Sequence, residues 1–284
     1  MDITSLIISV GSMGGLGLLF SAGLALANKK LYVEEDPRIA AVEDLLPGAN
    51  CGGCGYPGCK NFAENVVRGN AEISDCSVAA PEDIAAIGEV MGVEAAAAEK
   101  QIAVVMCQGG IEETAQKAEY YGIESCLAAN LTGGGEKLCS YGCLGFGDCI
   151  EECPFDAMYL GENGLPVILE DKCTGCGKCA EACPRDVIEM HPVSHQLFVL
   201  CKNHDDPKYS RQVCTKACIG CQICVRAVEE GSMYMEDNLA MIQYNQYGTT
   251  PELPTDRCPT DCLVIFDRMQ KHAGETGGME EVAA

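Results

Sequence analysis

Residues 173–184 read Cys-Thr-Gly-Cys-Gly-Lys-Cys-Ala-Glu-Ala-Cys-Pro, and this stretch decides how the middle of the chain folds. Cysteines recur at every third position from Cys173 to Cys179, and Cys183 follows four positions later, directly before Pro184. Three thiolates on so tight a loop can hold three irons of a four-iron cube. The two glycines between them let backbone N–H groups approach the sulfurs. The stretch therefore predicts a [4Fe-4S] cluster.

The spacing is similar to the run of bacterial ferredoxins, in which the fourth cysteine binds the other of two clusters. Zinc is the alternative, but its structural sites take four ligands from two Cys-x-x-Cys pairs rather than from a three-plus-one pattern. In the preceding run, residues 139–153, Phe146 stands where a middle cysteine is expected, and Cys139 can supply the missing thiolate. The two predicted ligand sets are Cys139, Cys143, Cys149 and Cys183 for one cluster, and Cys153, Cys173, Cys176 and Cys179 for the other.

The cysteine pattern repeats further along the chain. Cys139-Ser-Tyr-Gly-Cys143 aligns with Cys214-Thr-Lys-Ala-Cys218. Residues 157–169 and 232–242 each predict a strand, an acidic turn and a second strand. The strand that ends in Cys201 also parallels the strand that ends in Cys107.

The second copy has lost the residues of one cluster and kept those of the other. Val228 replaces a cysteine, and no cysteine lies between Cys224 and Cys258. The retained set, which predicts one cluster, is Cys218, Cys221, Cys224 and Cys258. Cys214 is an alternative fourth thiolate, whereas Cys262 aligns with small or apolar residues and is expected in the core.

A separate group near the N-terminus predicts the fourth [4Fe-4S] cluster. Its members are Cys51, Cys54, Cys59 and Cys76, with glycines among them. The literal Gly-x-Gly-x-x-Gly within it follows no strand, so nucleotide binding is not expected. The assignment gives four clusters and leaves Cys107, Cys126 and Cys201 without assigned chemistry.

Residues 3–27 carry no charged side chain, and this run is long enough to span a membrane. A secretory signal peptide is the alternative, but Asp2 precedes the run where such peptides carry a basic residue. Lys29 and Lys30 after the run place the bulk of the chain in the cytoplasm. The sequence thus predicts a single-pass protein of the cell membrane, in contact with lipid. The reducing cytoplasm and the odd count of 21 cysteines disfavour disulfides.

The chain has 284 residues, of which 19 are basic and 42 acidic, for a formal net charge of -23. Nucleic-acid binding is not expected, because phosphate contacts need a basic surface. The absence of Trp and the low aromatic content limit the apolar core, so bound metal is expected to order much of the chain.

The predicted fold class is α+β, with helices at 81–100 and 112–121 and a strand at 101–106. The predicted division is a transmembrane anchor at 1–28, a small helical [4Fe-4S] domain at 29–100, a linker with a strand and a helix at 101–137, a two-cluster ferredoxin-like domain at 138–194, a degenerate one-cluster ferredoxin-like domain at 195–266, and a disordered tail at 267–284.

This layout resembles the B subunit of the Rnf complex, the membrane-bound, ion-translocating ferredoxin:NAD+ oxidoreductase. The resemblance rests on Leu45–Cys59 (LLPGANCGGCGYPGC), Cys107–Gly110 (CQGG), Cys139–Cys149 (CSYGCLGFGDC) and Cys218–Cys224 (CIGCQIC). It implies an electron-relay subunit that receives electrons from soluble ferredoxin and passes them through partner subunits toward NAD+, coupled to ion translocation. The chain is then a translocase subunit without a catalytic substrate site of its own. A polyferredoxin-like subunit of a hydrogenase or formate-oxidising complex is the alternative, and a zinc scaffold without redox function is a third.

Overall fold

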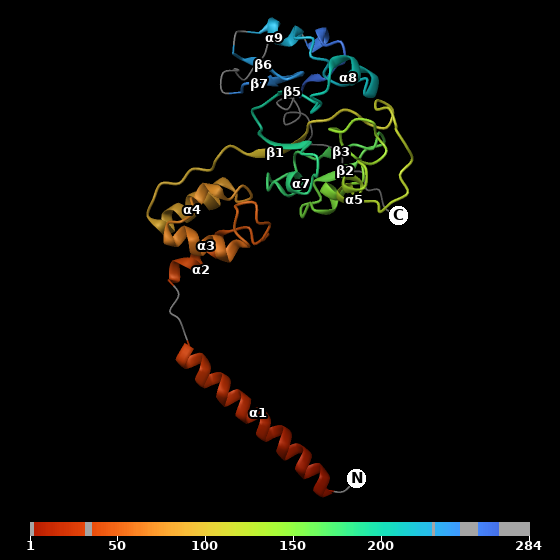
Figure 1. Cartoon of the computed structure of the whole chain (residues 1–284). Helices are drawn as coiled ribbons and strands as arrows, with labels where there is room; N and C mark the ends of the chain where they lie inside the picture. Colours follow the sequence, from red (N-terminus) through yellow and green to blue (C-terminus); the bar gives the residue numbers. More distant parts are fainter. Residues whose placement is uncertain (1–2, 32–35, 229–230, 245–254, 267–284) are drawn as a thin grey trace, which may run out of the picture.

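The computed structural model describes residues 3–31, 36–228, 231–244 and 255–266. The predicted tail at 267–284 lies outside these residues. Figure 1 shows one long helix, a small helical unit and a larger part built from short strands and loops.

Helix α1 (Ile3–Leu31) stands apart from the other elements in Figure 1. It is the one helix in the described part of the chain that is long and apolar enough to cross a membrane, over Val10–Lys30. The side chains of this stretch are exposed, including Leu18, Phe20 and Leu24. An apolar helix with no protein partner around it fits a lipid environment.

The helical unit follows, and four elements surround one core. They are α2 (Pro37–Leu45), α3 (Cys59–Arg68), the 3-10 helix η1 (Ile73–Asp75) and α4 (Pro81–Met91). Val42, Phe62 and Ile87 are almost completely buried where these helices meet. The predicted continuation of α4 to residue 100 is wrong, because Gly92 takes a left-handed conformation with φ 71° that ends the helix.

Strand β1 (Gln101–Val105) forms as predicted and pairs antiparallel with β4 (Ile188–Pro192), with Ala103 opposite Met190. The predicted hairpin between the first two cysteine runs is also present, as β2 (Met158–Leu160) and β3 (Pro166–Ile168). Short helices α6 (Asp148–Glu151) and α7 (Lys178–Glu181) each carry one buried cysteine of a run.

The C-terminal part repeats this plan. Its strands pair antiparallel as β5 (Leu197–Val199) with β8 (Leu263–Ile265), and as the predicted hairpin β6 (Met233–Glu236) with β7 (Leu239–Ile242). Its helices are α8 (Pro207–Val213), α9 (Ile223–Ala227) and the 3-10 helix η2 (Thr255–Arg257).

The predicted helix at 112–121 is wrong. This segment is extended, and its backbone bonds to two other parts of the chain. Ala115 donates its N–H to the carbonyl of Val213 and accepts the N–H of Leu138. These partners replace the bonds that a helix would have made within itself. The segment therefore connects the two cysteine-rich halves through backbone hydrogen bonds. The next helix along the sequence is α5 (Cys126–Leu131).

Candidate iron–sulfur sites

Four small cavities in the structure, each of about 20 Å³, are each lined by at least four cysteines. The cysteine sets are Cys51, Cys54, Cys59 and Cys76; Cys153, Cys173, Cys176 and Cys179; Cys126, Cys143, Cys149 and Cys183; and Cys107, Cys139, Cys201 and Cys214. Two of these sets match predicted ligand sets, and two differ from them.

The first cavity lies in the helical unit and combines a loop with two helix ends. Asn50 accepts the N–H of Cys59 at 2.9 Å through its side-chain oxygen and so fixes the start of α3. Before Cys76, the amide of Glu72 donates to the carboxylate of Asp75 at 3.0 Å and closes η1. Cys76 directly follows η1 and lines the same cavity as Cys51, Cys54 and Cys59.

The second cavity lies beside β1 and β4, and its three local cysteines come from the run at residues 173–179. Cys173 and Cys179 are buried, and burial raises the pKa of Cys179 to about 12. A thiol with such a pKa is neutral unless a cation binds it, so metal binding here releases a proton. The fourth thiol comes from Cys153 of the preceding run, as the crossed ferredoxin pattern predicts.

The third cavity contains Cys126, to which the sequence analysis gave no role, in place of Cys139. Asp148 brings Cys126 to the cavity. Its carboxylate accepts the N–H of Cys126 at 2.7 Å, the N–H of Leu127 at 3.0 Å and the hydroxyl of Ser125 at 2.9 Å. Burial raises the pKa of Asp148, but these hydrogen bonds outweigh it and lower the pKa overall. Asp148 directly precedes Cys149, so one carboxylate joins two cysteines of the set.

Cys139 lies in the fourth cavity instead, with Cys107, Cys201 and Cys214. A Cβ added to Gly142 would lie 3.5 Å from Sγ of Cys139 and 3.6 Å from Sγ of Cys107. The structure therefore brings Cys107 and Cys201, which the sequence left unassigned, together with Cys139 and Cys214, and Cys139 does not line the cavity of Cys143. The available signal was the repeat itself, which aligned Cys107 with Cys201 and Cys139 with Cys214.

The C-terminal set also gathers in the structure. Burial raises the pKa of Cys224 to about 11, and the neighbouring Cys218, Cys221 and Cys258 add to this through their charge. Cys262 is buried, as expected, but its sulfur lies 3.6 Å from that of Cys258. A hydrogen bond from the Cys262 thiol lowers the pKa of both Cys218 and Cys258.

Two cations lie beside the thiols of the third and fourth cavities. Arg185 donates to the carbonyls of Cys139 and Gly142, at 2.8 and 2.9 Å. Burial lowers the pKa of Arg185, whereas nearby thiolates raise it. Lys137 is 7% exposed and donates to the carbonyl of Gly109 at 2.7 Å. Buried positive charge is tolerated beside an anionic group, and a thiolate-bound cluster is one.

The cysteine sets fit a cluster better than a single ion. All 21 cysteines are free of disulfides. Among the described residues, no three Cys, His, Asp or Glu side chains converge tightly enough to hold one metal ion. Four thiols around a small cavity, with several irons between them, fit the wider geometry of a cube.

The first two cavities lie next to each other. Gly53 approaches the second loop so closely that an added Cβ would lie 2.7 Å from the carbonyl oxygen of Cys176. The charge of Cys51 also raises the pKa of Cys176, after burial as the main cause. The third cavity adjoins the second, because α6, which carries Cys149, packs against α7, which carries Cys179.

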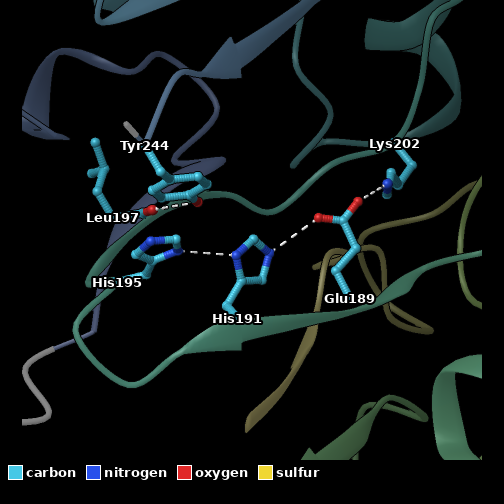
Figure 2. Close-up of polar contacts among 6 residues, drawn as sticks. All are labelled: Glu189, His191, His195, Leu197, Lys202 and Tyr244. Carbon is cyan, nitrogen blue, oxygen red and sulfur yellow. Dashed lines mark hydrogen bonds and ion pairs between the residues drawn. The ribbon is translucent and has the colours of Figure 1, made fainter. Parts of the chain in front are cut away.

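A polar network joins β4 to the start of the C-terminal part (Figure 2). Glu189 pairs with Lys202 and accepts a hydrogen bond from Nε2 of His191 at 3.1 Å. The ring of His195 stacks on Tyr244 with 3.9 Å between ring centres, and the Tyr244 hydroxyl donates to the carbonyl of Leu197 at 2.9 Å. The hydrogen bond with His191, followed by the one with Lys202, lowers the pKa of Glu189 to about 2.

The fold and these sites define an iron–sulfur protein with an apolar N-terminal helix. Two family models match the chain: one described as "Putative Fe-S cluster" over residues 46–78, and one described as a 4Fe-4S binding domain over residues 166–189. They cover the first cavity and the loop of the second.

Curated relatives cover nearly the whole chain. The B subunit of the Na(+)-translocating ferredoxin:NAD(+) oxidoreductase complex of Acetobacterium woodii is 45% identical over 92% of this chain and 78% of its own. Its counterpart in the ion-translocating oxidoreductase complex of Methanosarcina acetivorans is 39% identical over 84% of this chain and 90% of its own. The counterpart in the proton-translocating ferredoxin:NAD(+) oxidoreductase complex of Clostridium ljungdahlii is 38% identical over 87% of this chain and 88% of its own. The chain belongs to this family, the B subunits of Rnf-type ion-translocating oxidoreductase complexes, as the sequence analysis predicted.

Proposed function

We propose that this chain is the iron–sulfur relay of an Rnf-type complex, passing electrons from reduced ferredoxin toward NAD+ through partner subunits, coupled to ion translocation. The observation that carries the proposal is the contiguity of the cysteine-lined cavities. The first adjoins the second through Gly53 and Cys176, and the second adjoins the third through the packing of α7, with Cys179, against α6, with Cys149. A [4Fe-4S] cluster supplies reversible one-electron transfer, and the protein tunes its potential through charge, burial and hydrogen bonds to sulfur.

The ligands follow the predicted sets with one exchange. The proposed sets are Cys51, Cys54, Cys59 and Cys76; Cys153, Cys173, Cys176 and Cys179; Cys126, Cys143, Cys149 and Cys183; and Cys218, Cys221, Cys224 and Cys258. Cys126 takes the place that the sequence analysis gave to Cys139, because Cys126 lines the cavity of Cys143 and Asp148 holds it there. The first ferredoxin-like copy then holds two clusters and the second copy holds one. The helical unit holds the fourth.

Helix α1 is the proposed single membrane anchor. Its apolar side chains from Val10 to Leu26 are exposed to their surroundings, and Lys29 and Lys30 in its last turn favour a cytoplasmic position for everything that follows. The other membrane and peripheral subunits of the complex are the proposed partners on the acceptor side. The net charge of -23 disfavours the more negative, reduced state of a cluster and so contributes to low potentials.

The test compares the full chain with a variant that lacks residues 1–28, both purified anaerobically. We expect the shortened protein to be soluble and brown, because the anchor carries none of the proposed ligands. Reduced ferredoxin should bleach both proteins, but only the full chain should pass electrons to membranes that contain the partner subunits. Absence of bleaching in both proteins contradicts the relay, whereas loss of iron on truncation contradicts the independence of the anchor.

A further inference from the structure

A set of four cysteines outside the four proposed clusters lies between the two ferredoxin-like copies. Cys107 follows β1, Cys201 follows β5, and Cys139 and Cys214 precede the local runs of the two copies. The four thiols line one cavity, whose volume of about 20 Å³ equals that of the other three. Each copy contributes one residue of each kind, so the sequence repeat pairs Cys107 with Cys201 and Cys139 with Cys214.

Backbone hydrogen bonds to sulfur repeat in the same way. The N–H of Cys143 donates to Sγ of Cys107 at 3.4 Å, and the N–H of Cys218 donates to Sγ of Cys201 at 3.3 Å. Cys143 and Cys218 occupy the same position in the two copies. The N–H of Asn203 makes a second bond to Sγ of Cys201 at 3.4 Å. N–H groups aimed at cysteine sulfur are a feature of cluster sites, where they adjust the potential.

The surroundings also favour an anionic occupant. Cys139 and Cys214 are each 7% exposed, and the Nδ2 group of Asn203 points at Sγ of Cys139 from 3.9 Å. Arg185 donates to the carbonyl of Cys139 at 2.8 Å, and Lys137 donates to the carbonyl of Gly109, two residues after Cys107, at 2.7 Å. Two cations beside the thiols offset the charge that a thiolate-ligated cluster brings.

From this geometry we infer that Cys107, Cys139, Cys201 and Cys214 bind a fifth [4Fe-4S] cluster, which bridges the two ferredoxin-like copies. The inference rests on the relay proposed above. It places this site one hydrogen bond from a proposed ligand on either side, Cys143 in one copy and Cys218 in the other. The cluster of the second copy then adjoins the rest instead of standing alone. With this set, each of the 21 cysteines except Cys262 belongs to a group of four.

The test is anaerobic analysis of iron, sulfide and zinc in the full chain and in the double variant Cys139→Ser/Cys214→Ser. We expect about 20 irons per chain in the wild type, and loss of about one fifth of the iron and sulfide in the double variant. The EPR signals of the other reduced clusters should remain. Cys262→Ala is the matched control, because Cys262 belongs to none of the sets, and it should keep all the iron.

Two results overturn the fifth cluster. One is a wild type with about 16 irons whose iron content the double variant does not change. The other is one zinc per chain that the double variant removes. A wild type without iron and sulfide contradicts the relay itself, so the two failures are distinguishable. If the double variant loses more than one cluster, the single variant Cys214→Ser tests the site instead. A serine ligand should shift the EPR signal of one cluster. An unchanged spectrum contradicts the site.

Discussion

The carboxylate of Asp148 accepts the backbone N–H of Cys126 at 2.7 Å, although the two residues are 22 positions apart in sequence. Asp148 also neighbours Cys149, so a single side chain holds a remote cysteine beside the local pair of Cys143 and Cys149. Because of this contact, the cysteines that line the cavity include Cys126, whereas the sequence predicted Cys139 in that position.

Cys126→Ala is expected to remove the third cluster or leave a three-iron remnant, because Cys126 lines its cavity. Iron analysis and EPR of the oxidised protein measure this. Cys139→Ala is the matched variant and should leave the signal of this cluster in place. The opposite pattern, damage from Cys139→Ala and none from Cys126→Ala, would restore the ligand set that the sequence predicted.

Asp148→Ala should weaken the same cluster without removing a thiol. The change deletes three hydrogen bonds to a charged acceptor, at a cost of about 2–3 kcal/mol in local stability. We expect faster loss of iron from this cluster under a chelator, followed by the decay of its EPR signal. Glu151→Ala, on the exposed side of α6, is the control and should release iron at the wild-type rate.

Cys258→Ala should lower the iron content by one cluster or leave a three-iron remnant, although Cys258 lies far from Cys224 in sequence. Cys262→Ala should keep the iron, because Cys262 takes the place of Val187 in the first copy. Loss of the Cys262 thiol also removes a hydrogen bond to Cys258, so a shifted potential with unchanged iron is expected. Iron analysis and a redox titration separate the two variants, and iron loss in Cys262→Ala would identify it as the ligand.

Gly53→Ala should separate the helical unit from the second cluster loop. The new Cβ would lie 2.7 Å from the carbonyl oxygen of Cys176, a distance that real Cβ atoms essentially never show. We expect the iron content to stay unchanged while the magnetic coupling between the two reduced clusters weakens in EPR. Unchanged coupling would show that the two units adjust without moving apart.

Glu189→Gln should reduce stability at neutral pH but not at low pH. The pKa of Glu189 is lowered to about 2, so its contribution is complete above the ordinary pKa of a glutamate, about 4.3, and is lost as the pH falls toward 2. Because the side chain is 35% exposed, the contribution is discounted to roughly 1 kcal/mol. The difference in thermal unfolding midpoint between wild type and variant should be present at about pH 5 and should narrow below about pH 4. A difference that grows on acidification contradicts the assignment.

The sequence alone determined the features whose ligands or partners are local. The run from Cys173 to Cys179 specifies a cluster loop because three thiols at that spacing converge without help from the rest of the chain. The apolar stretch of α1 specifies a helix long and apolar enough to cross a membrane, and the two hairpins follow from alternating apolar residues around an acidic turn. The family also followed from sequence, because its motifs are local and specific.

Only the tertiary structure decided which distant residues meet. Cys126 and Cys139 are both upstream of the same run, and spacing favoured the nearer one, but the Asp148 carboxylate selects the more distant. The segment at 112–121 has the composition of a helix, yet it is extended because Val213 and Leu138 offer it backbone partners. The meeting of Cys107 with Cys201 and of Cys139 with Cys214 needs two copies facing each other, and no local pattern encodes how two folded units dock.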